Sequence, residues 1–146
     1  MIRPRVALLA LLLLTAGAHA QAWITLPGDR QYQGSLEDGE PYGSGTMVYP
    51  NGTRYTGDFV KGWREGRGAA IFYDGTRYEG EWQNDIPHGR GVMQWPNGER
   101  YEGEIVENTL HGHGVLTLPG GERYEGTFAN GEFRGPAARQ GGEASP

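Results

Sequence analysis

The stretch Tyr78-Glu79-Gly80-Glu81-Trp82, followed by His88-Gly89-Arg90-Gly91 and Trp95-Pro96-Asn97-Gly98, recurs along the whole chain in a fixed register. Its tyrosine returns every 23 residues without an insertion, at Tyr32, Tyr55, Tyr78, Tyr101 and Tyr124. One glycine follows each tyrosine after two positions (Gly34, Gly57, Gly80, Gly103, Gly126) and another after eleven (Gly43, Gly66, Gly89, Gly112, Gly135). Self-similarity at one fixed period is the signature of a repeat array, so the chain is expected to be one.

The pattern within each unit is that of β-structure. Tyr-x-Gly-x-aromatic alternates with a period of two, as a half-buried strand does, and no segment has helical periodicity. A second strand runs through the next Gly-x-Gly and ends at Tyr49, Phe72, Trp95 or Leu118. We therefore predict an all-β fold: a single-layer antiparallel meander of about ten short strands, in which each unit is a β-hairpin and the sheet is elongated and curved.

The turn that joins successive units fixes which side chains share a face. It reads Pro96-Asn97-Gly98 in one unit and has counterparts at residues 50–52, 73–75 and 119–121. Asn-Gly alone favours a two-residue type I′ turn. The proline instead presets φ for a type I turn and leaves the left-handed position to glycine. The resulting three-residue loop pairs Met93 with Tyr101 and Gly91 with Gly103, and it places the tyrosines, the aromatic position and Trp95 on one face.

The opposite face is expected to be solvated and to carry ladders of cross-strand ion pairs, each contributing about 0.2–1 kcal/mol. Its charged residues are Arg54, Arg77, Arg100 and Arg123 together with Glu79, Glu81, Glu102, Glu104 and Glu125. These carboxylates recur with the fold, whereas a catalytic pair would normally break the pattern. The sequence also lacks a phosphate-binding loop and a Gly-x-Ser-x-Gly elbow, so no catalytic residue is assigned and no enzyme is predicted.

The repeat resembles the MORN (membrane occupation and recognition nexus) family, whose motif is roughly Tyr-x-Gly-x-aromatic followed by Gly-x-Gly. The copies beginning at Tyr55, Tyr78 and Tyr101 carry it best, with structural glycines at Gly57, Gly66, Gly68, Gly80, Gly89, Gly91, Gly103, Gly112 and Gly114. The resemblance covers residues 32–135, as units 32–54, 55–77, 78–100, 101–123 and a partial 124–135. It implies the fold and leaves the function open, because such repeats serve in many unrelated proteins.

The two ends lie outside the array. Arg3 and Arg5, the apolar run Val6 to Leu14 and the small residues of Ala18-His19-Ala20 form the pattern of a signal peptide over residues 1–20. We expect cleavage near Ala20/Gln21 and a periplasmic or secreted location. Residues 21–31 keep the phase of the repeat and are predicted to supply an amino-terminal cap strand, whereas residues 136–146 are predicted to be disordered.

Charge restricts the partners. Without Arg3 and Arg5 the chain has 11 basic and 18 acidic residues, a net charge of −7. This balance is opposed to the basic surface that nucleic acid requires, and it disfavours electrostatic docking on anionic lipid. The chain has no cysteine, which excludes disulfides, a thiol nucleophile and a lipid-anchored bacterial lipoprotein.

Three histidines are weak candidates for a metal site. His88 and His111 occupy the same repeat position, and His113 follows His111 on the same face if that segment is extended. The alternative is that a histidine before Gly-x-Gly belongs to the MORN motif itself. Because no cysteine or carboxylate completes a ligand set, no metal and no cofactor are assigned.

The aromatic face is the candidate binding groove, although most of its rings are expected to form the core. The groove residues are Tyr55, Phe59, Tyr78, Trp82, Trp95, Tyr101, Tyr124 and Phe128. Trp63, predicted to lie in a loop, is the ring that the fold needs least. We predict a non-enzymatic scaffold that binds an unidentified protein along this groove or at a sheet edge. Binding of membrane phospholipid is the first alternative, a metal- or saccharide-binding module is the second, and the oligomeric state stays open.

Overall fold

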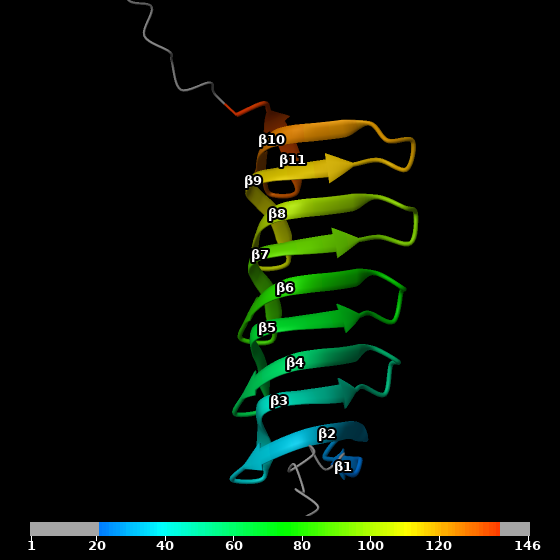
Figure 1. The fold of residues 1–146 in the computed structure, drawn as a ribbon, viewed down its shortest axis with the longest axis vertical. Coiled ribbons are helices and arrows are strands. Elements are labelled where there is room, and N and C mark those ends of the chain that lie inside the picture. Colours follow the sequence, from blue (N-terminus) through cyan, green and yellow to red (C-terminus); the bar gives the residue numbers. More distant parts are fainter. Residues whose placement is uncertain (1–20, 138–146) are drawn as a thin grey trace, which may run out of the picture.

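The computed structural model describes residues 21–137; the predicted signal peptide, and the predicted tail beyond residue 137, lie outside this range. Eleven strands form one antiparallel sheet in sequence order, stacked along the long axis of the molecule (Figure 1). The strands are β1 (Ile24–Leu26), β2 (Arg30–Glu37), β3 (Glu40–Val48), β4 (Arg54–Val60), β5 (Trp63–Ile71), β6 (Arg77–Gln83), β7 (Ile86–Gln94), β8 (Arg100–Val106), β9 (Thr109–Thr117), β10 (Arg123–Ala129) and β11 (Glu132–Gly135). The predicted all-β meander of hairpin repeats is confirmed.

Each unit contains a tight hairpin, and the hairpin of unit 55–77 corrects a prediction. Val60 pairs with Trp63 across the two residues Lys61 and Gly62, which have φ angles of 48° and 79°. Two consecutive left-handed residues make a type I′ turn, which allows the next strand to begin at once. Trp63 is therefore the first residue of β5, and its predicted place in a loop is wrong.

The turn that joins successive units has the predicted three-residue loop. The Trp95 N–H donates to the Glu99 carbonyl at 3.0 Å, the Gly98 N–H donates to the Trp95 carbonyl at 3.0 Å, and Gly98 has a φ of 93°. This is a type I turn closed by a left-handed glycine. Met93 pairs with Tyr101, as predicted.

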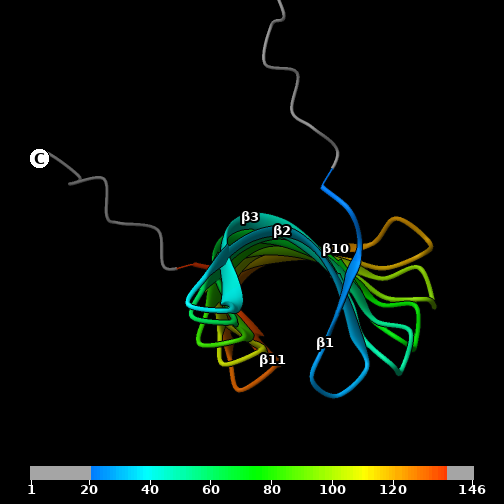
Figure 2. The same cartoon turned by 90° about the horizontal axis from the view of Figure 1, so that it is seen from below.

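The two glycines of each Gly-x-Gly have different roles. On β6 the single residue Glu81 separates Gly80 from Trp82, whereas their partners on β7, Gly91 and Pro87, are separated by three residues. The extra residues form a bulge at Gly89, where φ is 110°. Bulges bend a strand. The same shift recurs in the hairpins β2–β3, β4–β5 and β8–β9, and the sheet is bent into an arch (Figure 2), whose concave side we call the trough.

The second glycine makes room for the core, which forms the floor of the trough. A Cβ added to Gly91 would lie 2.5 Å from the hydroxyl oxygen of Tyr78, so the ring lies directly over the glycine. The Tyr78 hydroxyl donates to the Glu81 carbonyl at 2.7 Å. Equivalent hydroxyl-to-carbonyl bonds close the other full units, from Tyr32, Tyr55 and Tyr101.

The floor is continuous from unit to unit because the aromatic of one unit packs against the tyrosine of the unit before it. Trp82 meets Tyr55 and Tyr78 edge-to-face, with ring centroids 5.0 and 5.3 Å apart, and Phe59 meets Tyr32 in the same way. Each such pair contributes about 0.5–1.5 kcal/mol beyond its area burial. No unit of the array has a complete core of its own.

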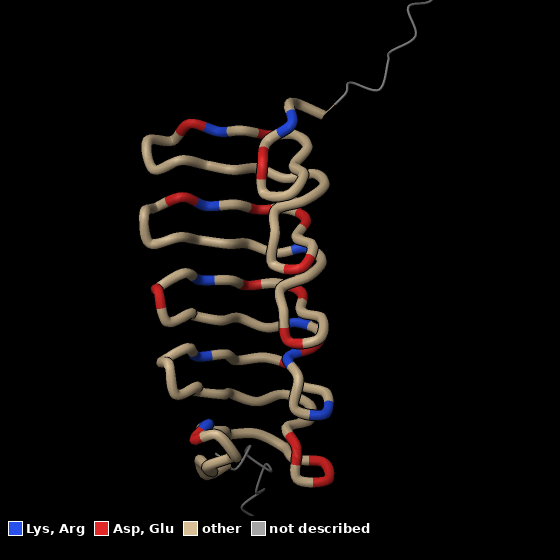
Figure 3. Tube along the Cα trace, turned by 180° about the vertical axis from the view of Figure 1, so that it is seen from behind, with Lys and Arg blue, Asp and Glu red and all other residues tan. Residues whose placement is uncertain are grey.

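Charged residues recur in regular columns along the array (Figure 3), but the predicted cross-strand ladders do not form. Among residues 21–137, the two ion pairs outside the trough, Arg100 with Glu102 and Arg134 with Glu132, each at 2.9 Å, join residues of one strand. The register explains this for the predicted arginines, since Arg100 lies between the neutral residues Gln94 and Thr117 on its neighbouring strands. Glu81 and Glu104 lie opposite Arg67 and Arg90, but no ion pair is found there among the described residues.

Candidate functional site

The accessible part of the trough is its opening, because the floor is closed by its own packing. Of the eight predicted groove residues, only Trp95 and Tyr124 are partly accessible. The other six are buried: Tyr55, Phe59, Tyr78, Trp82, Tyr101 and Phe128. Trp82 is held further by its indole N–H, which donates to the Gly68 carbonyl at 3.0 Å. A ligand in the trough would therefore meet the residues of the opening before those of the floor.

Two adjacent clefts lie in this opening. One, of about 280 Å³, is lined mainly by Phe72, Tyr73, Met93 and Trp95, with Asp74, Thr76 and Asn108 at its edge. The other, of about 170 Å³, is lined by Tyr49, Asn51, Thr53, Arg64, Phe72 and Tyr73. The clefts share Phe72 and Tyr73, so these two rings form the wall between them.

Tyr73 is the most exposed large apolar residue among those described, with 74% of its surface accessible. The equivalent turn position holds proline in the neighbouring units, at Pro50, Pro96 and Pro119. The Tyr73 N–H donates to the hydroxyl of Thr53 at 3.2 Å, which ties its turn to the turn before it. The backbone of Tyr73 is thus fixed while its ring projects beside both clefts.

Arg64 is a charged group that lies against the aromatic rings of the trough, and the sequence does not predict it there. The guanidinium lies over the Trp82 ring at 4.6 Å from the centroid and over Tyr49 at 5.3 Å. Its Nε donates to Asp85 Oδ1 at 2.8 Å, and Nη2 donates to the Asp85 carbonyl at 2.7 Å. The repeat pattern does single out Arg64, because the other units have an apolar residue or proline at this position: Pro41, Pro87, Leu110 and Phe133.

The ionisable groups of the floor are set to remain neutral. Burial raises the pKa of Tyr78 and of Tyr101 to about 12, and it raises the pKa of Tyr49 despite the opposing positive charge of Arg64. Such phenols are protonated near neutral pH and serve as hydrogen-bond donors. They provide packing and fixed donors, and no activated nucleophile is found among them.

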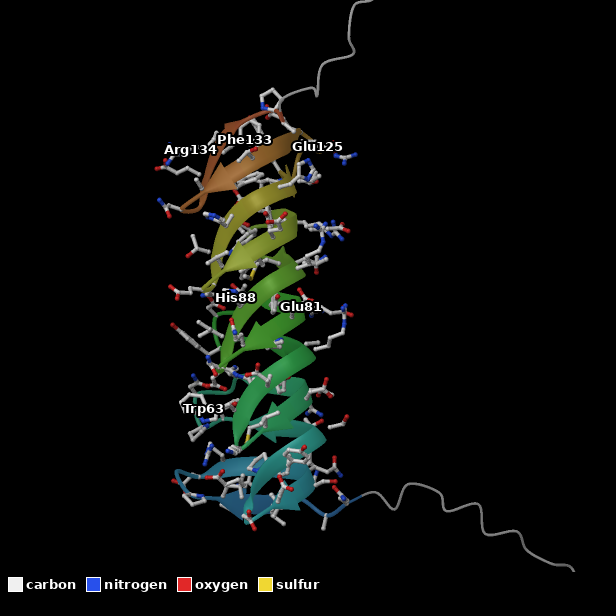
Figure 4. All side chains as sticks on the ribbon, turned by 90° about the vertical axis from the view of Figure 1, so that its left-hand side faces the viewer. Trp63, Glu81, His88, Glu125, Phe133 and Arg134 are labelled. Carbon is white, nitrogen blue, oxygen red and sulfur yellow. The ribbon has the colours of Figure 1, made fainter. Side chains whose placement is uncertain are left out.

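The candidate metal ligands are separated by the fold. His88 lies with Trp63 along the edge of the tight hairpins, opposite Glu81 and Glu125 (Figure 4). His88 Nδ1 accepts the Glu107 N–H of the next hairpin at 3.3 Å. In the preceding unit Glu65 occupies the same position and accepts the Asn84 N–H at 2.9 Å, so this position links consecutive hairpins.

His111 and His113 are exposed, and the bulge at Gly112, with a φ of 60°, interrupts the extended segment that the prediction assumed. Within residues 21–137 no group of three or more His, Cys, Asp and Glu side chains is arranged to hold a metal ion.

A larger cleft, of about 400 Å³, lies at the amino-terminal end of the trough. It is lined by Leu26, Pro27, Arg30, Gly39, Glu40, Pro41, Lys61, Gly62, Trp63 and Asp85. Trp63 is 56% exposed there. The turn between β1 and β2 lines this cleft together with Asp85, the ion-pair partner of Arg64. The opening of the trough is therefore polar at this end and apolar beyond Phe72.

The fold and the opening define an open-sheet repeat protein, a class that presents long surfaces for interaction. The chain belongs to the MORN repeat family, since the model of that family matches five consecutive repeats, at residues 32–54, 55–77, 78–100, 101–123 and 124–137. No curated protein matches the chain. No helix among residues 21–137 is long and apolar enough to cross a membrane.

Among solved structures, the chain is similar to the TCP domain of SAS-4 (dCPAP) from Drosophila melanogaster, in complex with a proline-rich motif of Ana2 (dSTIL). The two share 15% sequence identity, with a TM-score of 0.44. The match covers 69% of this chain and 55% of that one, so this chain spans about half the length of the solved domain.

Proposed function

We propose that this chain is an exported scaffold that holds a segment of a protein partner in the opening of its trough. As a MORN-repeat protein it is a repeat interaction module, from a family that is generally non-enzymatic and binds proteins or membranes. Beyond this family membership, we propose that the chain is exported, that its partner is a protein and that the binding surface is the opening of the trough. The location rests on the sequence of residues 1–20, which has the charge, apolar run and small-residue ending of a cleavable signal peptide.

The observation that carries the proposal is the pair of aromatic clefts around Phe72, Tyr73 and Trp95. The floor beneath them is packed without the help of a partner, so these partly exposed rings are available for binding. Aromatic residues in a concave setting with a polar margin are typical anchors of protein interfaces. A segment lying along the array would cross several units and meet one such ring in each.

The charge of the chain supports a protein partner over a membrane. The net charge of −7 repels anionic headgroups. The arginines stand in a column beside the glutamates of the same strands (Figure 3), and Arg100 pairs with Glu102 at 2.9 Å, so glutamates oppose the positive charge of these arginines.

The test is a pull-down from the extracytoplasmic fraction of the source cells, with proteins and lipids both read in the eluate. The variant to compare is Tyr73→Pro with Trp95→Leu, because Pro96 and Leu118 show that the array accepts these residues at the equivalent positions. Trp82 is unsuitable for this purpose, since it is 2% exposed and its removal would damage the core.

We expect one protein to be recovered in an amount comparable to the bait and lost with the folded variant. Circular dichroism of the variant, matching that of the native chain, is the control for folding. Recovery of phospholipid alone, released by salt, would overturn the proposal in favour of membrane binding. Recovery of the same protein by the variant would show that the opening of the trough is not the surface used.

A further inference from the structure

The unit 55–77 departs from its neighbours where the fold does not require it to. Positions that the fold needs recur in every unit of an array, because each unit packs in the same way against the next. Arg64 and Tyr73 replace the apolar and proline residues of the other units, and in the following unit Asp85 replaces the glycine or asparagine found at its position elsewhere. These departures meet at one place, the cleft beneath Tyr73 and the ion pair behind it.

Arg64 has donors left to use. Asp85 takes Nε and one N–H of Nη2, whereas Nη1 has no acceptor among residues 21–137. Within the described part of the chain no buried side-chain nitrogen or oxygen lacks a partner, so Nη1 must reach accessible surface. The aromatic rings and Asp85 hold the guanidinium in place, since its side chain is only 13% exposed. A fixed guanidinium with free N–H groups is suited to an oxygen anion.

The remaining polar groups of the same cleft also favour an acceptor ligand. Asn51 Oδ1 already accepts the Thr53 N–H at 2.9 Å, and the Thr53 hydroxyl accepts the Tyr73 N–H at 3.2 Å. What they leave free are the Asn51 amide N–H groups and the Thr53 hydroxyl hydrogen. No carboxylate lines this cleft. Its charge and its donors are therefore complementary to an anionic group.

The size of the cleft indicates a side chain of a macromolecule. Its volume of about 170 Å³ lies below the roughly 300–1,000 Å³ of small-molecule sites. The adjoining cleft is lined by Phe72, Met93 and Trp95 and suits an apolar side chain. The two are one repeat apart, which is two strand spacings or about 9.5 Å. A chain in the extended polyproline II conformation rises about 3.1 Å per residue and has three residues per turn, so residues three positions apart lie about 9.3 Å from each other and point to the same side.

We propose that the cleft at Arg64 binds the carboxylate of an Asp or Glu in an extended segment of the partner, and that an apolar residue about three positions away fills the cleft at Trp95. This inference rests on the proposed function and specifies the partner's chemistry. The carboxylate accepts N–H groups from Nη1 of Arg64, while Asp85 continues to hold the other side of the guanidinium.

The test starts with a display library of random peptides selected on the purified chain. Enriched peptides are then synthesised with the acid and with the matching amide (Asp→Asn or Glu→Gln), and their affinities are measured on the native chain and on Arg64→Leu with Asp85→Asn. The equivalent residues Leu110 and Asn108 come from the array itself, and the double change leaves the net charge unaltered. Arg77→Leu, an exposed arginine of the same unit on the convex face, is the matched control.

We expect enriched peptides to carry an acid about three positions from an apolar residue. Changing the acid of the peptide to its amide should weaken binding about 10- to 100-fold on the native chain and on the control variant Arg77→Leu. The same change should have no effect on the variant Arg64→Leu with Asp85→Asn. Enriched peptides without an acid, or with equal affinity as acid and amide, would overturn the inference.

The same peptides also separate this inference from the proposed function. Some peptides could lose binding to the variant Tyr73→Pro with Trp95→Leu and still bind the variant Arg64→Leu with Asp85→Asn as they bind the native chain. That result would support the trough as a binding surface and contradict the acid site at Arg64. Failure to enrich any peptide would overturn the recognition of a linear acidic segment, while the pull-down still decides the function independently.

Discussion

Units 55–77 and 101–123 have the same floor. Tyr55 and Tyr101 are fully buried, and each donates its hydroxyl to a backbone carbonyl at 2.8 Å, that of Asp58 or of Glu104. Each ring also lies over a pair of glycines on adjacent strands. The floor is repeated because every full unit packs its tyrosine over the same pair of glycines, although the apolar residue beside it changes from Phe59 to Ile105.

Their openings differ. Where unit 101–123 has Leu110 and Pro119, unit 55–77 has Arg64 and Tyr73, a held cation and an exposed ring. The comparison teaches that the floor specifies the fold and leaves the opening free to vary. Changes to the floor should therefore affect stability strongly in any unit, whereas changes to the opening of unit 55–77 should affect binding and leave the fold almost unchanged.

Alkaline pH should have the largest effect, because it acts on several floor tyrosines at once. Burial raises the pKa of Tyr78 and Tyr101 from 10 to about 12. A raised pKa means that the folded state favours the neutral phenol, so this stability is fully present below pH 10 and is lost as the pH rises through about 12. We expect cooperative unfolding in that range, followed by circular dichroism and tyrosinate absorbance. Gradual ionisation with the β-sheet signal retained would contradict it.

A methyl group on the floor should be the most damaging single change. In Gly80→Ala the new Cβ would lie 2.5 Å from both the Arg90 carbonyl oxygen and the Gly91 Cα, which are backbone atoms of the adjacent strand. Because backbone cannot move aside cheaply, we expect a loss of about 3 kcal/mol or more in the free energy of unfolding. Urea titration would measure it.

The control for this change is Gly120→Ala, in a turn where an added Cβ meets nothing within 4 Å and φ is not left-handed. Its effect should stay within about 0.5 kcal/mol. Similar losses at both glycines would show that the floor is less constrained than its packing indicates.

Breaking the ion pair from one side should cost less, about 2 kcal/mol. Asp85→Ala leaves the Arg64 guanidinium among aromatic rings without its counter-ion, and a buried charge without its partner is strongly unfavourable. The partial exposure of Asp85, whose side chain is 34% accessible, reduces the penalty. Arg64→Leu with Asp85→Asn should restore the lost stability. Equal loss in both variants, measured by thermal unfolding, would indicate that the ion pair holds the unit together.

The floor could be predicted from the sequence because it recurs. Five tyrosines at one spacing determine the hairpin units, and the proline of the 96–98 turn determines the three-residue loop and hence the pairing of Met93 with Tyr101. The opening could not be predicted in this way. Arg64 lies in the trough because the bulge at Gly66 turns its short strand segment inward, and no local pattern specifies that bend.

The position of Trp63 was missed for a related reason. Lys61 adopts a left-handed φ of 48°, which is uncommon for lysine, so the sequence does not indicate the two-residue turn that lets β5 begin at Trp63. The departures of unit 55–77 from its neighbours were nevertheless visible in the sequence, and the structure shows that they converge at one cleft.

Removing the tyrosine hydroxyl should lower the free energy of unfolding more in a complete unit than in the partial last unit. Tyr101→Phe removes a buried hydroxyl from its bond to the Glu104 carbonyl, which should cost about 1 kcal/mol. Tyr124 donates instead to the side chain of Glu122 at 2.6 Å, because its unit has Ala137 where the others have the second glycine. Tyr124→Phe should therefore change stability by less than about 0.5 kcal/mol in the same urea titration. A larger cost at Tyr124 would mean that the last unit is closed as tightly as the others.

Tyr73→Pro should have the smallest effect on the fold and the clearest effect on binding. Proline occupies this turn position in three other units, so the backbone conformation is compatible with it, and its restriction of the unfolded chain stabilises by about 0.4–1 kcal/mol. The loss of the Tyr73 N–H bond to Thr53 opposes that gain, at about 0.5–1.5 kcal/mol. The two nearly cancel, so the melting temperature should hardly change while the exposed ring between the two clefts is removed. A native-like melting temperature with undiminished capture of the partner would assign recognition to another surface, because this substitution makes the opening of unit 55–77 resemble that of unit 101–123 at the turn.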